Sequence, residues 1–396
     1  MALPKYYAHP EPDTLVPLLQ SQLPRSGPLL RRIQHDIVRK SPTACYLATF
    51  SPAARPSAAF EPPTPWLVAY VDLYVWPETQ VWVYSSLEAE GTTSCGDRST
   101  FKSSDFHLNQ ARMQVIGLIS HCFEELFPRF LASSGVLDSS TTGRYKDQLR
   151  SPPPNPPTTL LLGTVHSGVV KLLRDAMTLS GPLPYPRYHL PYADDCMKYS
   201  FCRLSYDPAC NHTPLILPPG YRCRSLNGLE GFQPYQYGLV RSRTYIARSK
   251  TALQNMASVV LYYDGPEDSK QETNGDEGNQ ETKDAQEMPI AWTFLGYDAS
   301  LLSLYVEPEH RGRGLAAFLA KSVMQRGMLE KGQFSLAMEH EKEDGWAFAD
   351  VALDNHASRR VMEKMGGEPA WTAAWIVAQP CRGEQCASCT GNGTSG

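Results

Sequence analysis

The sequence lacks the features that mark secreted, membrane-spanning and strongly charged proteins. Its first residues, MALPKYYAHPEPDTLVPLL, have neither a basic start nor a continuous apolar stretch, and no later run of about 18 apolar residues follows. Lys and Arg number 37 against 41 Asp and Glu, whereas nucleic-acid and anionic-membrane surfaces need a surplus of positive charge. We therefore expect a cytoplasmic protein that binds neither nucleic acid nor membrane.

The ten cysteines are scattered at irregular intervals, which argues against a disulfide framework. Cys381, Cys386 and Cys389 lie close together near the end of the chain. Three thiols with no nearby fourth ligand make a poor zinc site, and the surrounding Gly, Ser and Thr are typical of a frayed terminus. We expect no metal and a flexible tail over residues 381–396.

Residues 1–176 predict an N-terminal α/β domain. Apolar runs separated by turn residues indicate a small antiparallel sheet, and apolar residues three and four apart indicate a helix that packs on it. The proline-rich segment 151–158 excludes helix and central strand, and a strand, a turn and a helix are expected after it. The strands are expected at 44–50, 66–75 and 81–88, the helix at Met113–Phe130, and the later strand and helix within 159–175.

A segment crowded with Pro and Tyr, residues 177–222, is expected to connect the two halves across the protein surface. A second domain is expected over 223–380. Within it, residues 264–288 hold nine Asp or Glu and two Lys, hence a net charge of −7, and cannot bury enough apolar surface to order themselves. This insert separates two predicted paired strands, 256–263 and 289–296. We expect a dispensable loop; a regulatory or partner-binding segment is the alternative.

A strand, a glycine-rich turn and a helix follow one another from residue 300. SLLSLYV, Ser300–Val306, is a nearly continuous apolar run that Pro308 stops. The glycines of RGRG, Arg311–Gly314, let backbone amides approach an anion, and LAAFLAKSVM starts a helix directly afterwards. Unpaired amides, the helix dipole and two arginines predict a pocket for a pyrophosphate. Neither GxxxxGK nor GxGxxG with an acidic residue about 20 positions on is present, which excludes the two commoner phosphate loops.

The turn resembles the signature of the GNAT superfamily. In that signature Arg or Gln, two residues, Gly, one residue, and Gly or Ala follow a strand that ends in Val and Pro; here Arg311, Gly314 and Ala316 occupy these positions. A chance Arg-Gly pair on a helix cap, or a fragment of an RNA-binding repeat, is the alternative, but a repeat needs many copies in a disordered segment.

The second part of the signature lies further along the chain. GWAFADVALDN, Gly345–Asn355, ends a strand and leads into the helix HASRRVMEKMGG, which glycines close. In the GNAT pattern such a strand carries Val, then Asn four residues on, then a helix that ends near Gly. Val351, Asn355 and Gly366 match this pattern.

The resemblance implies an α/β (α+β) fold, with a GNAT-like mixed sheet flanked by helices in the C-terminal half. It also implies that acetyl-CoA or another acyl-CoA is the cosubstrate, without a metal. Main-chain groups of the strand would pair with the pantetheine arm, and Asn355 would bond its amide, although an Asn there is also an ordinary helix N-cap. The cofactor-binding residues are then Leu304, Tyr305, Val306, Arg311, Gly312, Arg313, Gly314, Leu315, Ala316 and Asn355.

The catalytic groups depart from the family pattern. Many members place a Tyr seven residues after the Asn to protonate the departing thiolate, but Met362 stands there, and a thioether cannot donate a proton. In the glycine N-acyltransferase-like branch of the superfamily a Glu near the start of this strand is the presumed base, and Ser300, which aligns with it, is too weak a base unaided. Asp298 is the nearest carboxylate, with Glu307 and Glu339 as weaker candidates. The alternative for Asp298 is that it only forms the turn GYDAS.

Residues 236–378 show a narrower resemblance, to the C-terminal half of the glycine N-acyltransferase-like branch, most specifically in RGRGLA and DNHAS. The N-terminal half has a similar order of elements without an RGxG turn, so we expect a degenerate GNAT-like domain that shapes the acceptor pocket. The function expected is an N-acyltransferase, of the N-acetyltransferase type, acting on a small-molecule amine or amino acid. A protein lysine or N-terminal acetyltransferase and a non-catalytic CoA-binding protein are the alternatives.

Overall fold

The computed structural model describes residues 4–52, 62–90, 101–134, 158–177, 187–210, 215–244, 246, 248–265, 287–329, 332–334 and 345–381. Predictions on the other residues lie outside the described part. They concern the proline-rich segment 151–157, the acidic insert between 266 and 286, the carboxylate Glu339 and the tail from 382 onward. No helix in the described ranges is long and apolar enough to cross a membrane.

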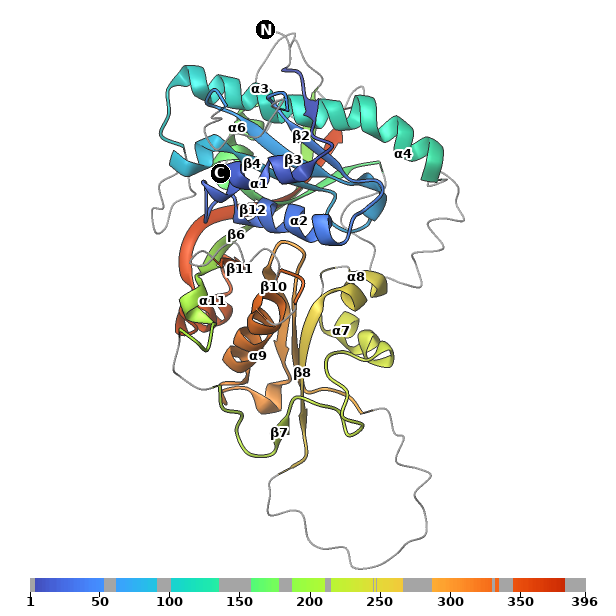
Figure 1. Cartoon of the computed structure of the whole chain (residues 1–396), viewed down its shortest axis with the longest axis vertical. Coiled ribbons are helices and arrows are strands. Elements are labelled where there is room, and N and C mark those ends of the chain that lie inside the picture. The colour runs from blue at the N-terminus through green and yellow to red at the C-terminus, as the bar shows by residue number, and fades with distance from the viewer. Residues whose placement is uncertain are drawn as a thin grey trace, which may run out of the picture.

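A mixed sheet of twelve strands runs through both halves of the chain (Figure 1). Its order from one edge to the other is β1, β2, β3, β4, β5, β12, β6, β11, β10, β9, β8 and β7. The predicted α/β class is confirmed. The strands are β1 (Tyr7–Ala8), β2 (Cys45–Ala48), β3 (Leu67–Val71), β4 (Val81–Ser85), β5 (Leu160–His166), β6 (Tyr188–Phe201), β7 (Tyr221–Arg222), β8 (Ala257–Tyr263), β9 (Ala291–Leu295), β10 (Ser300–Val306), β11 (Ala347–Ala352) and β12 (Glu368–Pro380).

Helices cover both faces of the N-terminal part of the sheet (Figure 1). Alternate residues of β3 point to opposite faces, so Ala69 packs under α3, α4 and α6 while Tyr70 packs under α1 and α2. The helix predicted at Met113–Phe130 is present as α3 and α4, with a π-helical turn between them. The helices are α1 (Val16–Gln20), α2 (Gly27–Val38), α3 (Asp105–His121), α4 (Phe127–Ser134) and α6 (Ser167–Met177), and the π turn is Cys122–Leu126.

The C-terminal part of the sheet has the same two-sided cover. Leu261 and Leu301 lie in a core with α9 and α11, whereas Val260 and Phe294 lie in a core with α7 and α8 on the opposite face. The helices are α7 (Tyr237–Arg243), α8 (Lys250–Asn255), α9 (Leu315–Met324), with a π turn at Gln325–Leu329, and α11 (His356–Lys364). Short 3₁₀ turns lie at Pro12–Thr14, Leu73–Val75, Ser86–Glu90, Arg203–Ser205, Pro234–Gln236 and Pro308–His310.

The last strand of each half completes the sheet of the other half. β6 follows α6 along the chain, yet it pairs with β11 of the C-terminal half. β12 follows α11, yet it pairs with β5 of the N-terminal half. β6 and β12 also pair with each other, antiparallel, along most of their length. This exchange joins the two halves into one sheet.

We predicted that residues 177–222 form a connection across the surface. This prediction is corrected, because β6 lies in the middle of the sheet. Residues 196–201 alternate between the two faces: Met197 and Tyr199 enter the core under α9 and α11, whereas Cys196 packs on the other side. The prolines concentrate before this stretch, and the charged Asp194, Asp195 and Lys198 interrupt its apolar pattern. The tertiary partners override the local composition.

Candidate active site

The glycine-rich turn lies between the end of β10 and the start of α9. After the 3₁₀ turn at Pro308–His310, Gly312 and Gly314 take the left-handed conformation, with φ of 76° and 79°. Gly314 is the N-cap residue of α9 and has no side chain to bond the first amides of the helix. Residues 311–314 are exposed. The helix therefore presents unpaired N–H groups and the positive end of its dipole to an anion.

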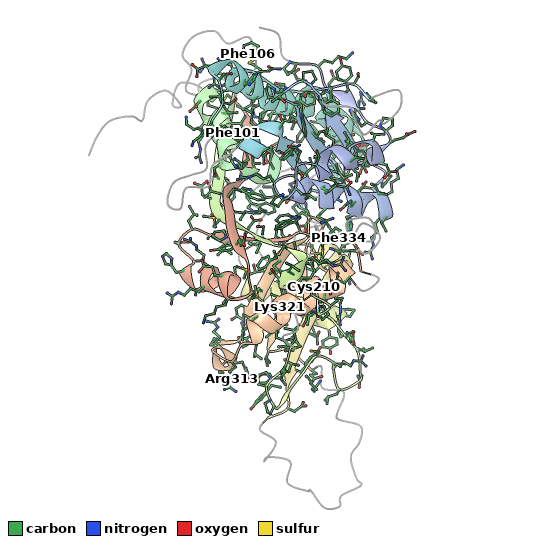
Figure 2. The ribbon with its side chains drawn as sticks, turned by 60° about the vertical axis from the view of Figure 1, so that its left-hand side comes forward. Phe101, Phe106, Cys210, Arg313, Lys321 and Phe334 are labelled. Atoms are coloured by element: carbon green, nitrogen blue, oxygen red, sulfur yellow. The ribbon has the colours of Figure 1, made fainter. Side chains whose placement is uncertain are left out.

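The two arginines of the turn are held by main-chain and tyrosine oxygens. Arg311 donates from Nε to the carbonyl of Val306 at 2.9 Å and stacks over the ring of Tyr305. Arg313 donates to Oη of Tyr221 at 3.1 Å, and to the carbonyl of Glu309 at 3.3 Å. Figure 2 shows Arg313 at the end of the C-terminal half that lies farthest from the N-terminal half. Both cations thus lie beside the uncapped helix terminus.

A gap opens between the parallel strands β10 and β11. The two strands pair only at Ser300 with Phe348 and at Leu301 with Ala349, and separate after that point. On its other edge β10 pairs with β9 through a bulge between Leu302 and Tyr305. The bulge leaves the rest of β10, up to the glycine-rich turn, with a main-chain edge that β11 does not use. The predicted Leu304, Tyr305 and Val306 lie on this edge.

Asn355 lies just before α11, and Met362 lies within this helix. The Asn355 Oδ1 accepts the Ser358 N–H at 3.0 Å, so the N-cap role is confirmed, and the pantetheine contact stays a prediction. Met362 is buried at 3% exposure among the core side chains under α9 and α11. Its thioether has a packing role, and neither its chemistry nor its position supplies a proton.

A cavity of about 440 Å³ lies where the two halves meet. It adjoins Leu302, at the end of β10 that lies away from the glycine-rich turn. Both halves form its wall: from the N-terminal half Arg32, Tyr74, Val75, Trp76, Pro77, Glu78, Thr79 and Trp82, and from the C-terminal half Arg248, Ser249, Thr251, Ala252, Asn255, Met256, Tyr297, Asp298, Leu302 and Trp375. Turn, gap and cavity follow one another along β10.

Two protein families match the chain. The family described as the N-terminal domain of the acyl-CoA N-acyltransferase verG matches residues 3–199, and the FR47-like family matches residues 281–376. Together the two matches support an assignment to the GNAT superfamily of acyl-CoA N-acyltransferases. The first match ends inside β6, as expected if β6 belongs to the N-terminal half by sequence and only pairs with the other half. Neither family is the glycine N-acyltransferase-like branch, so that finer resemblance stays a prediction.

A solved structure shares the fold over nearly the whole chain, and others match it with lower TM-scores. A Drosophila protein, 12% identical, covers 95% of this chain and 98% of its own, with a TM-score of 0.51. A GCN5-related N-acetyltransferase from Sphaerobacter thermophilus is 11% identical over 96% of this chain and 98% of that chain, with a TM-score of 0.39. A tandem GNAT protein from the clavulanic acid biosynthesis pathway is 14% identical over 94% and 97%, with a TM-score of 0.36. No curated protein matches the chain in sequence.

Asp298 and Ser300 form the turn between β9 and β10 of the GNAT fold. The Asp298 Oδ2 accepts the Ser300 hydroxyl at 2.8 Å, and Oδ1 accepts the Ser300 N–H at 3.2 Å. These bonds show the turn-forming role that was the alternative for Asp298. Asp298 also belongs to the cavity wall. Glu307 instead pairs with Arg243 at 3.0 Å, at the opposite end of β10.

Sequence reasoning missed the charged groups that the N-terminal half and the segment just before α8 bring to the cavity. Glu78 accepts the Ser249 N–H at 2.7 Å and lies 3.7 Å from Nη1 of Arg248. The guanidinium of Arg32 lies 4.0 Å from the ring centroid of Tyr70 and 5.5 Å from that of Tyr297. These residues lie far apart in the sequence and outside any motif, so no local pattern could have identified them.

Two further titratable groups near the cavity are uncharged at neutral pH. Burial, together with the nearby Arg32 and Arg39, lowers the pKa of His35 to about 3. Burial raises the pKa of Tyr297 to about 12. The rings of His35 and Tyr297 lie 4.4 Å apart. The fixed charges of the wall are therefore those of Arg32, Glu78, Arg248 and Asp298.

Proposed function

We propose that this GNAT protein transfers an acetyl or other acyl group from CoA to an amine of a small molecule or amino acid. The observation that supports this most is the continuous path along β10, from an uncapped helix N-terminus, through a main-chain gap, to the cavity between the two halves. A pyrophosphate, an extended arm and an acceptor need these three environments in this order.

Each part of the path has residues suited to its role. Gly312, Gly314 and the amides of Leu315 and Ala316 would hold the pyrophosphate, with Arg311 and Arg313 at its rim. The main chain of Leu304, Tyr305 and Val306 would pair with the pantetheine arm. Bound acyl-CoA supplies a thioester carbonyl, and the cavity beside Leu302 would hold the amine that attacks it.

Asp298 is the proposed base. An alkyl ammonium has a pKa near 10, so it must lose a proton before its nitrogen can attack a carbonyl carbon. The Asp298 carboxylate, fixed by the Ser300 hydroxyl and N–H, would take this proton directly or through one water. The nitrogen–carbon bond then forms as the carbon–sulfur bond breaks. The thiolate can leave without an acid because a thiol is a good leaving group near neutral pH.

The test is incubation of the full chain with acetyl-CoA and a pooled library of small amines, peptides and proteins. Mass spectrometry follows the acylated products, and a thiol reagent follows free CoA. We expect an acetylated small amine, formed in step with free CoA. Acylation of peptides alone would favour the protein acetyltransferase, and CoA binding without any product would favour a non-catalytic CoA-binding protein.

A further inference from the structure

The cavity between the halves has an aromatic wall. Five of its side chains carry aromatic rings: Tyr74, Trp76, Trp82, Tyr297 and Trp375. Its volume of about 440 Å³ lies within the range of pockets for small molecules. Aromatic walls of this kind favour a ligand with a planar apolar body, since rings stack on rings and exclude water.

The wall also has two charges of opposite sign that do not pair with each other. Arg248 and Glu78 form one ion pair within the wall. The other two charged residues of the wall are Arg32 and Asp298. Among the described residues, these two do not form an ion pair with each other. The carboxylate next to Arg32 is Asp36, at 3.7 Å, and it already accepts bonds from the hydroxyls of Tyr46 and Tyr70 and from the Ser41 N–H.

The unpartnered polar atoms of the wall are all donors. Nε of Arg32, Nε1 of Trp82 and Nε of Arg248 are buried and have no hydrogen-bond acceptor in the described part of the chain. Within the same described ranges, no side-chain oxygen of a wall residue is both buried and without a hydrogen-bond partner. Arg32 is itself only 5% exposed, with its guanidinium enclosed by the rings of Tyr70, Trp82 and Tyr297. Nη1 of Arg32 faces Asp36 and Nδ1 of His35, and Nη2 donates to the hydroxyl of Tyr70, so Nε is the donor of this buried cation that is left for an anionic ligand.

We propose that the acceptor is an aromatic amine that also carries a carboxylate, with the carboxylate bound at Arg32 and the amine at Asp298. This inference rests on the proposed acyl transfer and narrows its substrate class. The zwitterion matches the two wall charges of opposite sign that do not pair with each other, and its aromatic body matches the five rings. Arg32 is then a specificity residue, because it contacts the part of the acceptor that does not react.

The first test varies the acceptor and leaves the protein unchanged. Acetyl-CoA turnover by the full chain is measured with tryptophan, tryptophan amide and tryptamine, and with 4-(aminomethyl)benzoate and 4-methylbenzylamine. We expect kcat/KM to be about tenfold or more higher for the acid in at least one series, the effect of one buried charge-assisted hydrogen bond. Equal or faster turnover of the analogues that lack the carboxylate, in both series, would overturn the proposal.

The second test varies the wall. Arg32→Gln should lower kcat/KM about tenfold for the carboxylate acceptor and less than about threefold for the analogue that lacks the carboxylate. Trp82→Phe removes one donor, keeps an aromatic wall and should have the same selective effect, so it serves if Arg32→Gln does not fold. Arg222→Gln is the matched control, because Arg222 bonds Asp264 and Glu287 and is not part of the wall. An equal loss for both acceptors would contradict the role of Arg32.

The outcomes separate this inference from the proposed function. Acylation of amines that lack a carboxylate or an aromatic body, as fast as or faster than the aromatic amino acids and with release of CoA, would leave the acyltransferase assignment in place and refute the zwitterionic acceptor. If no acceptor in these series or in the pooled library is acylated while acetyl-CoA still binds, both the inference and the proposed reaction are refuted.

Discussion

The two halves of the sheet each contain a pair of parallel strands that separate soon after they meet, but only one pair encloses a usable gap. In the C-terminal half β10 and β11 separate after Leu301, and the gap leads to the glycine-rich turn. In the N-terminal half β4 and β5 pair at Val81 and Leu162. The space between these strands leaves a cavity of only about 10 Å³, bordered by Tyr84, Glu88 and Trp371 among others.

The difference comes from the segment that leaves the first strand of each pair. After β10 a proline stops the strand, and two glycines with positive φ lead into a helix with free amides. After β4 the chain turns through Ser86–Glu90, which places Leu87 and Glu88 inside the protein. Side chains thus occupy in one half the place that main-chain amides leave open in the other. The same strand arrangement therefore serves packing in one half and is proposed to serve binding in the other.

The sharpest way to break this comparison is to give the C-terminal turn a side chain. Gly314→Val should weaken CoA binding about 100-fold, as the loss of two charge-assisted hydrogen bonds from backbone amides would. The fold should survive because a Cβ at Gly314 meets no atom within 4 Å, although the positive φ costs about 1 kcal/mol. Calorimetric titration with CoA measures the affinity.

Gly228→Val is the matched control for that variant. Gly228 also has a positive φ, of 75°, and a Cβ there would likewise meet open space, but it lies outside the turn and the cavity wall. This control should show the same loss of stability and an unchanged affinity. Unchanged CoA affinity in folded Gly314→Val would remove the basis of the cofactor assignment.

A smaller effect is expected at the carboxylate that faces the cavity. Asp298→Asn should lower the maximal rate at least about tenfold, because an amide cannot take a proton from the amine. CoA affinity should stay the same. Steady-state rates from about pH 5 to 9 test this, and Glu88→Gln, the buried carboxyl of the N-terminal half, should leave the rates intact. A wild-type rate for Asp298→Asn at every pH would point to a base elsewhere.

Glu88, the buried carboxyl of the N-terminal half, should affect the pH dependence of stability rather than the activity. Burial raises the pKa of Glu88 to about 8, from an ordinary value of 4.5. Between about pH 6.5 and 8 the folded protein therefore binds a proton that the unfolded chain has released, so stability falls as pH rises, by about 1 kcal/mol per pH unit. Glu88→Gln should flatten this slope in urea unfolding. An identical slope in the variant would show that Glu88 is ionised in the folded protein.

Two buried histidines should make stability rise with pH, which is opposite to the effect of Glu88. Their effect is expected below about pH 6.5, the ordinary pKa of histidine. Burial lowers the pKa of both His35 and His166 to about 3, so the unfolded chain takes up protons there that the folded protein does not. Stability is lost as pH falls through this range. The slope of stability against pH that is assigned to Glu88 is therefore measured above this range, between about pH 6.5 and 8.

The smallest effect is expected for the acidic insert. Deletion of residues 267–285 should leave acyl transfer and thermal stability nearly unchanged, because lengthening a surface loop costs little closure entropy and this sequence has few apolar residues. The deletion keeps Asp264 and Glu287, which both pair with Arg222. Loss of activity in an equally stable deletion variant would show that the insert takes part in the reaction.

The strand, turn and helix of the cofactor site could be predicted from the sequence because their signals are local. The predicted bounds Ser300–Val306 and Leu315–Met324 are those of β10 and α9. Proline, the two glycines and the apolar periods of two and 3.6 residues act within a few residues of the positions they control. The N-cap role of Asn355 is likewise evident from its place directly before a helix.

Only the tertiary structure decided which strands pair and what meets at the cavity. The exchange of β6 and β12 depends on partners from the other half, and no pattern within a strand specifies its neighbour. Arg32, Glu78, Arg248 and Asp298 come from four separate segments that this exchange brings together. Burial of Glu88 results from the same packing. The acceptor cavity therefore arises from long-range pairing, whereas the cofactor turn is a property of a short stretch of chain.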